Sequence, residues 1–385
     1  MAAALRDFYD ASVVADIAGD LKRAYPAFDT RAFTEECLDG LAPLSLTGRA
    51  AHIAAAMRRH LPADFDQVAD ILERSLGDPH AGTESFGMAP FKYLPHTMLT
   101  ASDGLGHFEA SMRLQYELTQ RFTAEFSIRA FLNAHPDATY TRLLAWSTDQ
   151  NPHVRRLVSE GSRPRLPWAP RLRHFQKDPT PVLALLERLK DDPDLYVRRS
   201  VANNLNDIAK DHPEVVVAVC RRWLTEVRSG RASARLNREW IVKHALRSLV
   251  KAGHKGALDL MGAGARPKIR LEGVRITPQR VRKGGRVECT CLLVSTSRAS
   301  QDLLIDYAVH YVKADGRTSP KVFKLKRVAL DGRSSAPLRM VVTLADLTTR
   351  KHYPGPHHID LLVNGRRLPL GTFTLLRPGA NFSTD

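Results

Sequence analysis

The segment SEGSRPRLPWAPRLRHF, residues 159–175, combines residue types that could do chemistry. Its three prolines disfavour regular helix and predict a stiff loop around Trp168. Arginines stand on both sides of this tryptophan, at positions Arg163, Arg165, Arg171 and Arg173. An indole in such a loop could contact a cationic base through its π face, which is worth about 0.5–2 kcal/mol, while the arginines bind phosphates. The alternative is that Trp168 fills a gap between helices.

Two acidic residues have a sequence context that suits a role beside this loop. Glu160 directly precedes it and ends a predicted helix, with Gly161 placed to cap that helix. Glu125 lies in AEFSIRAFL, within a second predicted helix. Ordinary helix-surface ion pairs would also explain both acids, because arginines stand at four-residue spacing from them, at Arg121, Arg129 and Arg156.

The elements that must position these residues are predicted to be helices throughout residues 1–262. Apolar residues recur at three- and four-residue spacing in four early segments, which are Ser12–Ala24, Thr30–Leu41, Thr47–His60 and Phe65–Leu76. A glycine- and proline-containing stretch, Gly77–Gly106, interrupts the pattern. A long helix is predicted to follow from Phe108 to Leu132.

The second half of this region contains a weak internal repeat. NPHVRRLVSEG at 151–161 recurs as PDLYVRRSVANNL at 193–205, with the Val-Arg-Arg triplets 43 residues apart. A third copy, REWIVKHALRSLVKAG at 238–253, follows 45 residues later. A period in the forties is typical of HEAT repeats, helix pairs that bury their apolar faces against their neighbours. The sequence therefore predicts an all-α HEAT-like solenoid.

Within the second copy two faces can be distinguished by helical spacing. The predicted core stripe consists of Val197, Val201, Leu205 and Ile208. A separate polar stripe consists of Arg199, Asn203, Asn206 and Lys210. Stacked helices with such stripes would form a basic concave surface that suits a DNA duplex.

The charge balance supports a polyanionic partner. The chain has 57 Lys and Arg against 41 Asp and Glu, a formal net charge of +16. Residues 151–260 alone hold 22 basic and 12 acidic residues, or +10. A soluble chain this basic usually binds nucleic acid. The alternative is a generally basic proteome that uses arginine for solubility.

After about residue 264 the pattern changes to the two-residue alternation of β-strands. Strands are predicted around 268–276, 287–293, 303–311, 321–330, 338–344, 358–363 and 368–375. Asn364-Gly365 is a strong hairpin signal between the last two. Seven short strands in about 110 residues suggest an immunoglobulin-like β-sandwich over 266–377, followed by a frayed tail, 378–385.

Three stretches, SEGSRPRLPWA, YVRRSVANNLNDIAKDHPEVV and AEFSIRAFL, resemble the AlkC branch of the AlkC/AlkD DNA alkylation-repair glycosylases. The resemblance extends from the N-terminus to about residue 255. It implies HEAT-like repeats with a C-terminal immunoglobulin-like domain in many members. It also implies excision of cationic lesions such as 3-methyladenine and 3-methylcytosine from double-stranded DNA, without the deep base flipping of other base-modifying enzymes.

The chemistry that this resemblance implies needs acids and an aromatic surface. A ring-alkylated base is already positive and leaves as a neutral molecule, so the sugar cation is what requires a carboxylate. Glu125 and Glu160 are the expected acidic pair, Trp168 contacts the lesion or sugar, and Asp207 is a third candidate. The DNA-binding set comprises Phe126, Arg156, Arg163, Arg165, Arg199, Asn203, Asn206 and Lys210.

Other functions have weaker support in the sequence. A non-catalytic HEAT-repeat protein that binds bent or damaged DNA is the main alternative, but it would need neither the acids nor Trp168. No metal site or cofactor is expected, since the histidines lack ligand spacing. Cys289 and Cys291 alternate on one strand face and are expected to be buried. We expect a cytoplasmic monomer without a membrane span.

Overall fold

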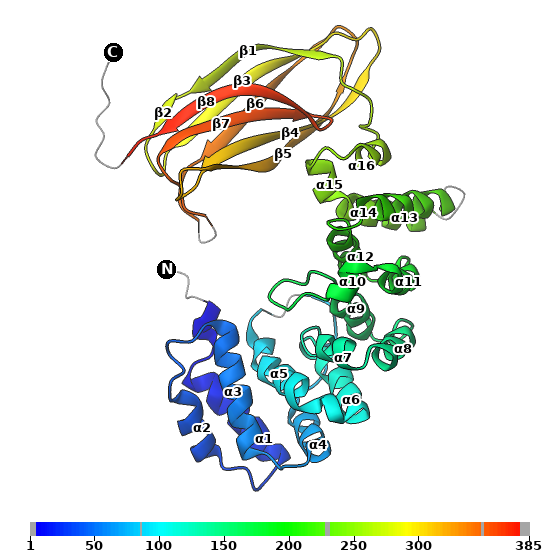
Figure 1. Cartoon of the computed structure of the whole chain (residues 1–385), viewed down its shortest axis with the longest axis vertical. Coiled ribbons are helices and arrows are strands. Elements are labelled where there is room, and N and C mark those ends of the chain that lie inside the picture. Colours follow the sequence, from blue (N-terminus) through cyan, green and yellow to red (C-terminus); the bar gives the residue numbers. More distant parts are fainter. Residues whose placement is uncertain (1–4, 85–86, 228–231, 348–349, 378–385) are drawn as a thin grey trace. The chain divides into compact units, whose positions relative to one another are not determined.

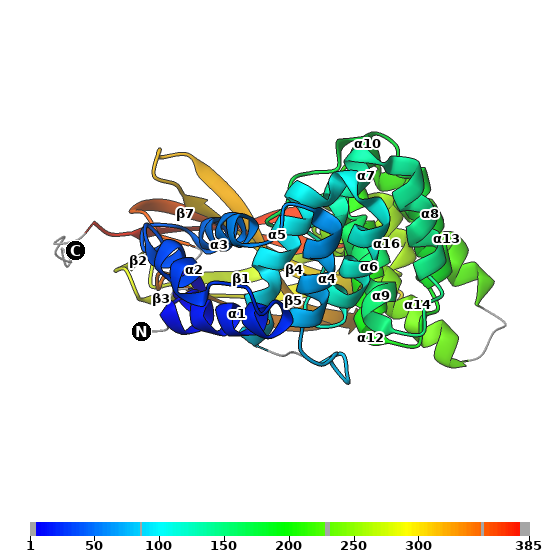
Figure 2. The same cartoon turned by 90° about the horizontal axis from the view of Figure 1, so that it is seen from below.

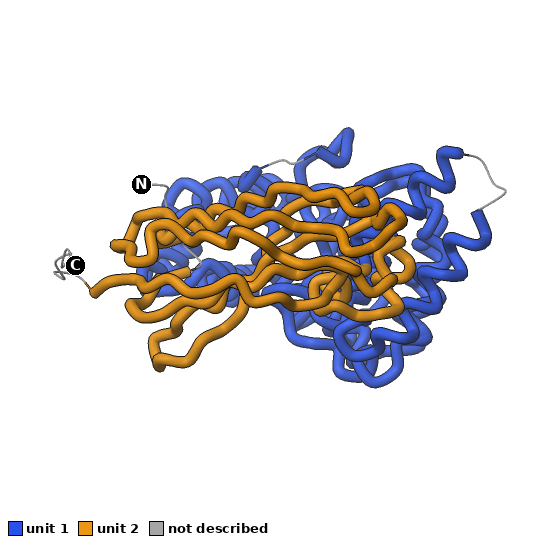
Figure 3. The backbone as a smooth tube through the Cα atoms, turned by 90° about the horizontal axis from the view of Figure 1, so that it is seen from above, with its two compact units in different colours: residues 1–245 blue, residues 246–385 orange. Residues whose placement is uncertain are grey.

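The computed structural model describes residues 5–84, 87–227, 232–347 and 350–377. It divides into two compact units, Met1–Ala245 and Leu246–Asp385 (Figure 3). The short helices α15 (Arg247–Lys251) and α16 (Lys255–Leu260) group with the strands in this division. The helical domain predicted from the sequence extends to residue 262, and these predicted limits stay a prediction. The predicted frayed tail, 378–385, lies outside the described residues.

The first unit is built from helices joined by short turns (Figure 1). The α-helices are α1 (Ala11–Ala24), α2 (Thr30–Leu38), α3 (Leu46–His60), α4 (Phe65–Ser75), α5 (Leu94–Asp103), α6 (Phe108–Thr119), α7 (Ile128–Ala134), α8 (Pro136–Trp146), α9 (Pro152–Gly161), α10 (Arg173–Lys177), α11 (Thr180–Leu189), α12 (Leu195–Ile208), α13 (Pro213–Glu226) and α14 (Ala232–Ala245). Three 3₁₀ turns lie among them, at Leu5–Phe8, Ala89–Tyr93 and Gly104–Gly106. Within the described ranges, no helix combines the length and apolarity needed to cross a bilayer.

The repeat seen in the sequence corresponds to a stack of equivalent helices. α9, α12 and the start of the third copy, α14, carry the three repeated segments, and α12 packs against both of the others. Figure 2 looks along this stack, with the three helices close together in the view. The predicted core stripe of α12 is buried along its whole length. The HEAT-like architecture is therefore confirmed.

Local sequence explains where α9, the helix that carries the site, begins and ends. The Asn151 side chain accepts the His153 backbone N–H at 2.8 Å, and Pro152 occupies the first turn, which is a favourable N-terminus. Gly161 is the last helical residue, not a left-handed cap as predicted. A Cβ at Gly161 would lie 2.5 Å from Ile128 Cγ2. Glycine is needed here because α7 approaches α9 closely.

Two helix predictions were wrong in part. Residues 77–106, expected to interrupt the helices, contain α5. The long helix expected over 108–132 is two helices, and Glu125 lies on the turn between them. The Thr123 hydroxyl accepts the Glu125 backbone N–H at 3.3 Å, a local bond that competes with helical hydrogen bonding. The helix-spaced ion pairs suggested for Glu125 are absent from the described contacts: Arg121 pairs with Glu117 instead.

The second unit contains the predicted sandwich. Its strands are β1 (Ile269–Thr277), β2 (Arg280–Val281), β3 (Arg286–Ser295), β4 (Gln301–Val312), β5 (Thr318–Leu330), β6 (Ser335–Thr343), β7 (Gly355–Val363) and β8 (Arg366–Leu375). They form a three-stranded sheet, β1-β3-β6, and a five-stranded sheet, β2-β8-β7-β4-β5. Of the strands within the described residues, the sequence missed β2, which is two residues long. Asn364 and Gly365 join β7 to β8 with φ of 48° and 74°, as a type I′ hairpin requires. Cys289 and Cys291 are buried and unbridged, as expected.

Substituting Gly161 with alanine tests the close approach of α7 and α9. We expect the variant to lose about 1–3 kcal/mol of unfolding free energy, because the new methyl group overlaps Ile128 in a packed core. Urea denaturation measures this loss. Gly106→Ala is the matched control, since a Cβ there meets no atom within 4 Å. Equal stability of the two variants would contradict the packing argument.

Candidate functional site

A cleft of about 360 Å³ in the helical unit gathers the residues that the sequence singled out. Five segments supply its walls: the described residues between α4 and α5, the turn before α7, the face of α9, the loop after α9 and the start of α12. Its lining includes Thr123, Glu125, Phe126, His153, Arg156, Glu160, Arg163, Trp168 and Tyr196. Glu125, Glu160 and Trp168 thus line one cleft, although Glu125 lies far from the other two in sequence.

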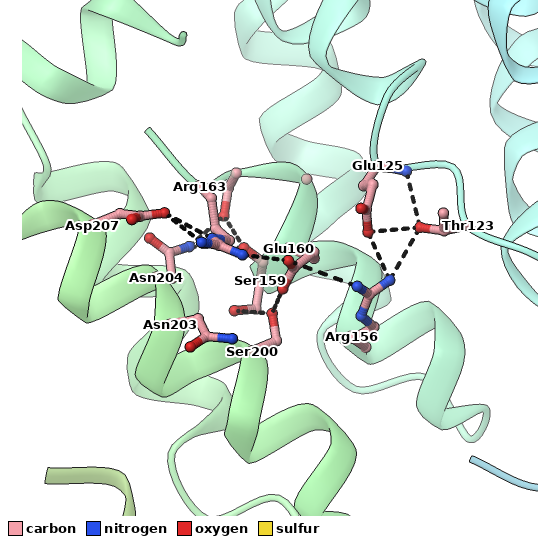
Figure 4. Close-up of polar contacts among 12 residues, drawn as sticks. Thr123, Glu125, Arg156, Ser159, Glu160, Arg163, Ser200, Asn203, Asn204 and Asp207 are labelled. Atoms are coloured by element: carbon pink, nitrogen blue, oxygen red, sulfur yellow. Dashed lines mark hydrogen bonds and ion pairs between the residues drawn. The ribbon is translucent and has the colours of Figure 1, made fainter. Parts of the chain in front are cut away.

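Glu160 is buried in the last turn of α9, with 6% of its surface exposed. Its Oε1 accepts from Arg163 Nη1 at 2.5 Å, and its Oε2 accepts from Ser200 Oγ at 2.6 Å (Figure 4). Burial by itself would raise the pKa of this carboxyl, but the positive charges of Arg156 and Arg163 outweigh it and lower the pKa below its usual value. Glu160 is therefore ionised at neutral pH.

Glu125 reaches the same cleft from the turn before α7. Its Oε2 lies 2.7 Å from Arg156 Nη1 and accepts from Thr123 Oγ1 at 2.8 Å. Arg156 Nη2 also lies 3.7 Å from Glu160 Oε1, so one guanidinium stands between the two acids. The central carbon of the Arg156 guanidinium also lies over the Tyr196 ring, 5.3 Å from the ring centroid. Burial would lower the pKa of Arg156, and the two carboxylates raise it overall.

Asp207, the third predicted acid, is buried beside Arg163 and does not line the cleft. Arg163 Nε donates to Asp207 Oδ2 at 2.8 Å, and Lys210 Nζ donates to Oδ1 at 2.8 Å. Asp207 is 3% exposed and is not among the residues that line the cleft. In the structure it orients Arg163, which in turn binds Glu160.

The loop after α9 presents Trp168 to the cleft. This residue is 68% exposed and has a φ of 64°, a left-handed conformation that bulky residues rarely adopt. Leu166 and Leu172 are buried on either side and anchor the loop. The gap-filling alternative for Trp168 is wrong, because an indole this exposed fills no space between helices.

The predicted DNA-binding residues are placed in different ways. Phe126 lines the cleft, and Arg199 is exposed on α12. Arg165 donates from Nε and Nη2 to the two carboxylate oxygens of Asp211. Arg156 and Arg163 are held by carboxylates as described above.

The predicted polar stripe of α12 is not uniformly exposed. Asn203 Oδ1 accepts from His244 Nε2 at 3.0 Å, and Lys210 donates to Asp207. Asn206 is 3% exposed and donates to the Ala245 carbonyl at 2.7 Å. Its expected place on an exposed surface is therefore wrong: it holds α14 against α12.

The side of α12 that serves the site is rotated from the predicted stripe by about one residue. Tyr196 lines the cleft, Ser200 binds Glu160, Asn204 donates to the Ser159 carbonyl, and Asp207 binds Arg163. These positions also follow helical spacing. Sequence reasoning missed this face because serine and tyrosine next to valines look like the border of a core stripe.

Other missed residues are Thr123 and Arg129, whose contacts depend on the turn before α7. Among the described residues one group of metal-ligating types meets, Asp64, Asp66 and His107. Asp64 caps α4 and Asp66 binds His107 at 3.0 Å, which accounts for the group without an ion. None of the three lines the cleft.

The fold and site together define a HEAT-like repeat protein of the DNA alkylation-repair type, with a C-terminal sandwich. Residues 270–377 match the family model described as "Uncharacterised protein YhaZ, C-terminal Ig-like domain". The uncharacterized protein YhaZ of Bacillus subtilis (strain 168) is 34% identical over 365 residues, covering 94% of this chain and 96% of its own. The structure of the Pseudomonas fluorescens alkylpurine DNA glycosylase AlkC, bound to DNA containing an abasic site analog, superposes with a TM-score of 0.87 at 39% identity, covering 97% of this chain and 100% of that chain. The chain belongs to the AlkC family of DNA glycosylases, as its motifs predicted.

Removing the buried guanidinium of Arg163 tests the electrostatics of the site. Arg163→Met leaves Glu160 and Asp207 without their shared partner. We expect the variant to lose about 3–5 kcal/mol of unfolding free energy at neutral pH. The loss has a defined pH dependence. In the wild type the lowered pKa of Glu160 contributes stability that is present above its unfolded value, near 4.5, and is lost as the pH falls through the folded value.

In the variant the pKa of Glu160 rises, so the native state takes up a proton at higher pH than the unfolded state. The deficit relative to wild type should therefore shrink as the pH is lowered from 7 toward about 5. Urea denaturation across this range measures it. A deficit independent of pH would contradict the ion-pair explanation and leave only lost packing.

Proposed function

We propose that this protein hydrolyses the N-glycosidic bond of cationic N-alkylated bases, of the 3-methyladenine and 3-methylcytosine type, in double-stranded DNA. The observation that carries the proposal is the cleft that Glu125, Glu160 and the exposed Trp168 line together. The AlkC relative that matches over nearly the whole chain is an alkylpurine DNA glycosylase bound to DNA. We further propose that the protein acts as a monomer in the cytoplasm.

The chemistry of the leaving group explains why acids without a proton donor suffice. A base alkylated at a ring nitrogen departs as a neutral molecule, so protonation by the enzyme is not required. The developing charge lies on the sugar, and a fixed anion nearby stabilises it. Because its pKa is lowered, Glu160 is suited to this electrostatic role and unsuited to general acid catalysis.

The two acids can be assigned different roles from their contacts. Both oxygens of Glu160 are held, one by Arg163 and one by Ser200. The described contacts of the Glu125 carboxylate all fall on Oε2. We therefore assign orientation of the attacking water to Glu125 Oε1, and stabilisation of the sugar cation to Glu160.

Trp168 supplies the surface for the lesion itself. Its ring is exposed on a short loop and lines the cleft. A cationic base placed over the indole gains about 0.5–2 kcal/mol from the cation–π contact. A neutral base lacks this gain, so the same contact favours alkylated over normal bases.

Release of methylated base from alkylated DNA tests the proposed activity. We expect Glu160→Gln to slow single-turnover release by about 10²–10³-fold, because it removes a fixed charge aimed at the transition state. Glu109→Gln is the control and should leave the rate unchanged, since Glu109 is exposed and paired with Arg142 outside the cleft. The proposed activity fails if the wild type releases no base. The role of Glu160 fails if Glu160→Gln is as fast as the control while binding DNA equally well.

Salt dependence separates arginines that meet phosphates from those already paired within the protein. Affinity for duplex DNA should fall steeply as salt is raised from about 50 to 200 mM. Arg199 is exposed, so Arg199→Met should reduce the salt slope by about one. Arg165 is neutralised by Asp211, and Arg165→Met should leave the slope nearly unchanged. Fluorescence anisotropy measures both slopes, and equal effects of the two substitutions would contradict this assignment.

A further inference from the structure

The two parts of the proposed site belong to separate segments, the Glu125 turn and the Trp168 loop. Neither segment is regular secondary structure around its key residue. A site that discriminates between bases must hold both at a fixed separation, because a displacement of about 1 Å can cost about 100-fold in rate. Arg129 lies in α7, which directly follows the Glu125 turn, and its side chain hydrogen-bonds to the Trp168 loop.

Arg129 lies in α7 and is 3% exposed. Its Nη1 donates to the carbonyls of Gly161, at 3.0 Å, and Arg163, at 2.6 Å. Its Nε donates to the carbonyl of Pro170 at 3.2 Å, and Nη2 donates to the same oxygen. These carbonyls lie on both sides of Trp168, so one guanidinium bridges the two sides of the loop.

The buried charge of Arg129 has unusual hydrogen-bond partners. Burial lowers the pKa of Arg129 to about 10, so the group is still charged at neutral pH. Its hydrogen bonds within the described part of the chain go to carbonyl oxygens and not to a carboxylate. A planar guanidinium can serve several acceptors at fixed angles, which a single ammonium group cannot.

Trp168 needs this kind of support. Its left-handed backbone is a conformation that persists only where the surroundings hold it. The loop has further constraints of its own: the buried Leu166 and Leu172, the Arg165–Asp211 pair, and a backbone hydrogen bond from the Leu172 N–H to the Pro164 carbonyl at 3.2 Å. The hydrogen bonds of Arg129 connect this loop to α7.

We propose that Arg129 is the positioning residue that fixes the Trp168 loop relative to the Glu125 turn. This inference rests on the proposed function for its effect on catalysis. Arg129 itself contacts neither DNA nor the reacting atoms. Its effect on excision passes through Trp168.

A double-mutant cycle tests this route. Single-turnover release from a duplex with one 3-methylated base is measured for the full-length wild type, Arg129→Met, Trp168→Ala and the double variant. We expect Arg129→Met to slow release by about 100-fold. In the Trp168→Ala background the same substitution should slow it by less than about 3-fold, because coupled residues are not additive.

Arg49→Met is the matched control. Arg49 is also buried, and it donates to two carbonyls, those of Tyr9 and Ala42, outside the cleft. This variant should lose stability without changing the release rate of the folded fraction. Hydrogen exchange provides a readout independent of activity: amides of residues 162–172 should exchange faster in Arg129→Met and unchanged in Arg49→Met.

Additive effects of the Arg129 and Trp168 substitutions would overturn the proposal, since Arg129 would then act on excision by another route. Unchanged exchange in the loop would overturn it as well. Failure of the proposed function gives a different result: the wild type releases no base, while the exchange experiment still reports whether Arg129 holds the loop.

Discussion

The structure of the site depends on the pairing of charges buried between α9 and α12. Arg163 is held by Glu160 on one side and Asp207 on the other, and removing any one of these would leave buried charges with fewer partners in the interior. The same contacts therefore join two repeats and fix the carboxylate of the site. Arg156 extends the chain of charges to Glu125, so that the turn before α7 becomes part of one connected network.

This network changes what the basic composition means. The +16 net charge favours a polyanionic binding partner, but many arginines of the repeats form ion pairs within the protein. Arg155, for instance, binds Asp192 and Asp194, and Arg238 binds Asp191 and Glu226. A count of charges thus indicates the kind of partner, whereas the contacts decide which side chains can meet it. A buried arginine in this fold is therefore interpreted first as part of the structure and not as a contact to DNA.

The sequence was sufficient where periodicity alone sets the answer. Alternation predicted seven of the eight strands, and Asn364-Gly365 predicted their last hairpin, since only a few residues tolerate that turn. The predictions from sequence failed where a side chain competes with the backbone for hydrogen bonds. They also failed where the exposed face of a helix must be located to within one residue. α6 ends at Thr119 although the apolar pattern continues, and Thr123 binds the Glu125 backbone in the turn that follows. Asn206 is buried although its spacing matched exposed neighbours. Both outcomes depend on contacts across the fold.

The site residues were easier to name than to place, and the reason lies in how the cleft is made. Helices hold Glu160 and Arg156, but Glu125 and Trp168 lie on a turn and a loop whose conformations depend on distant partners. Gly161 permits Ile128 to approach α9, and the next residue, Arg129, can then reach the loop carbonyls. Close packing of α7 and α9 is thus a precondition for the loop geometry. The rigidity of an irregular segment here derives from helices that lie beneath it.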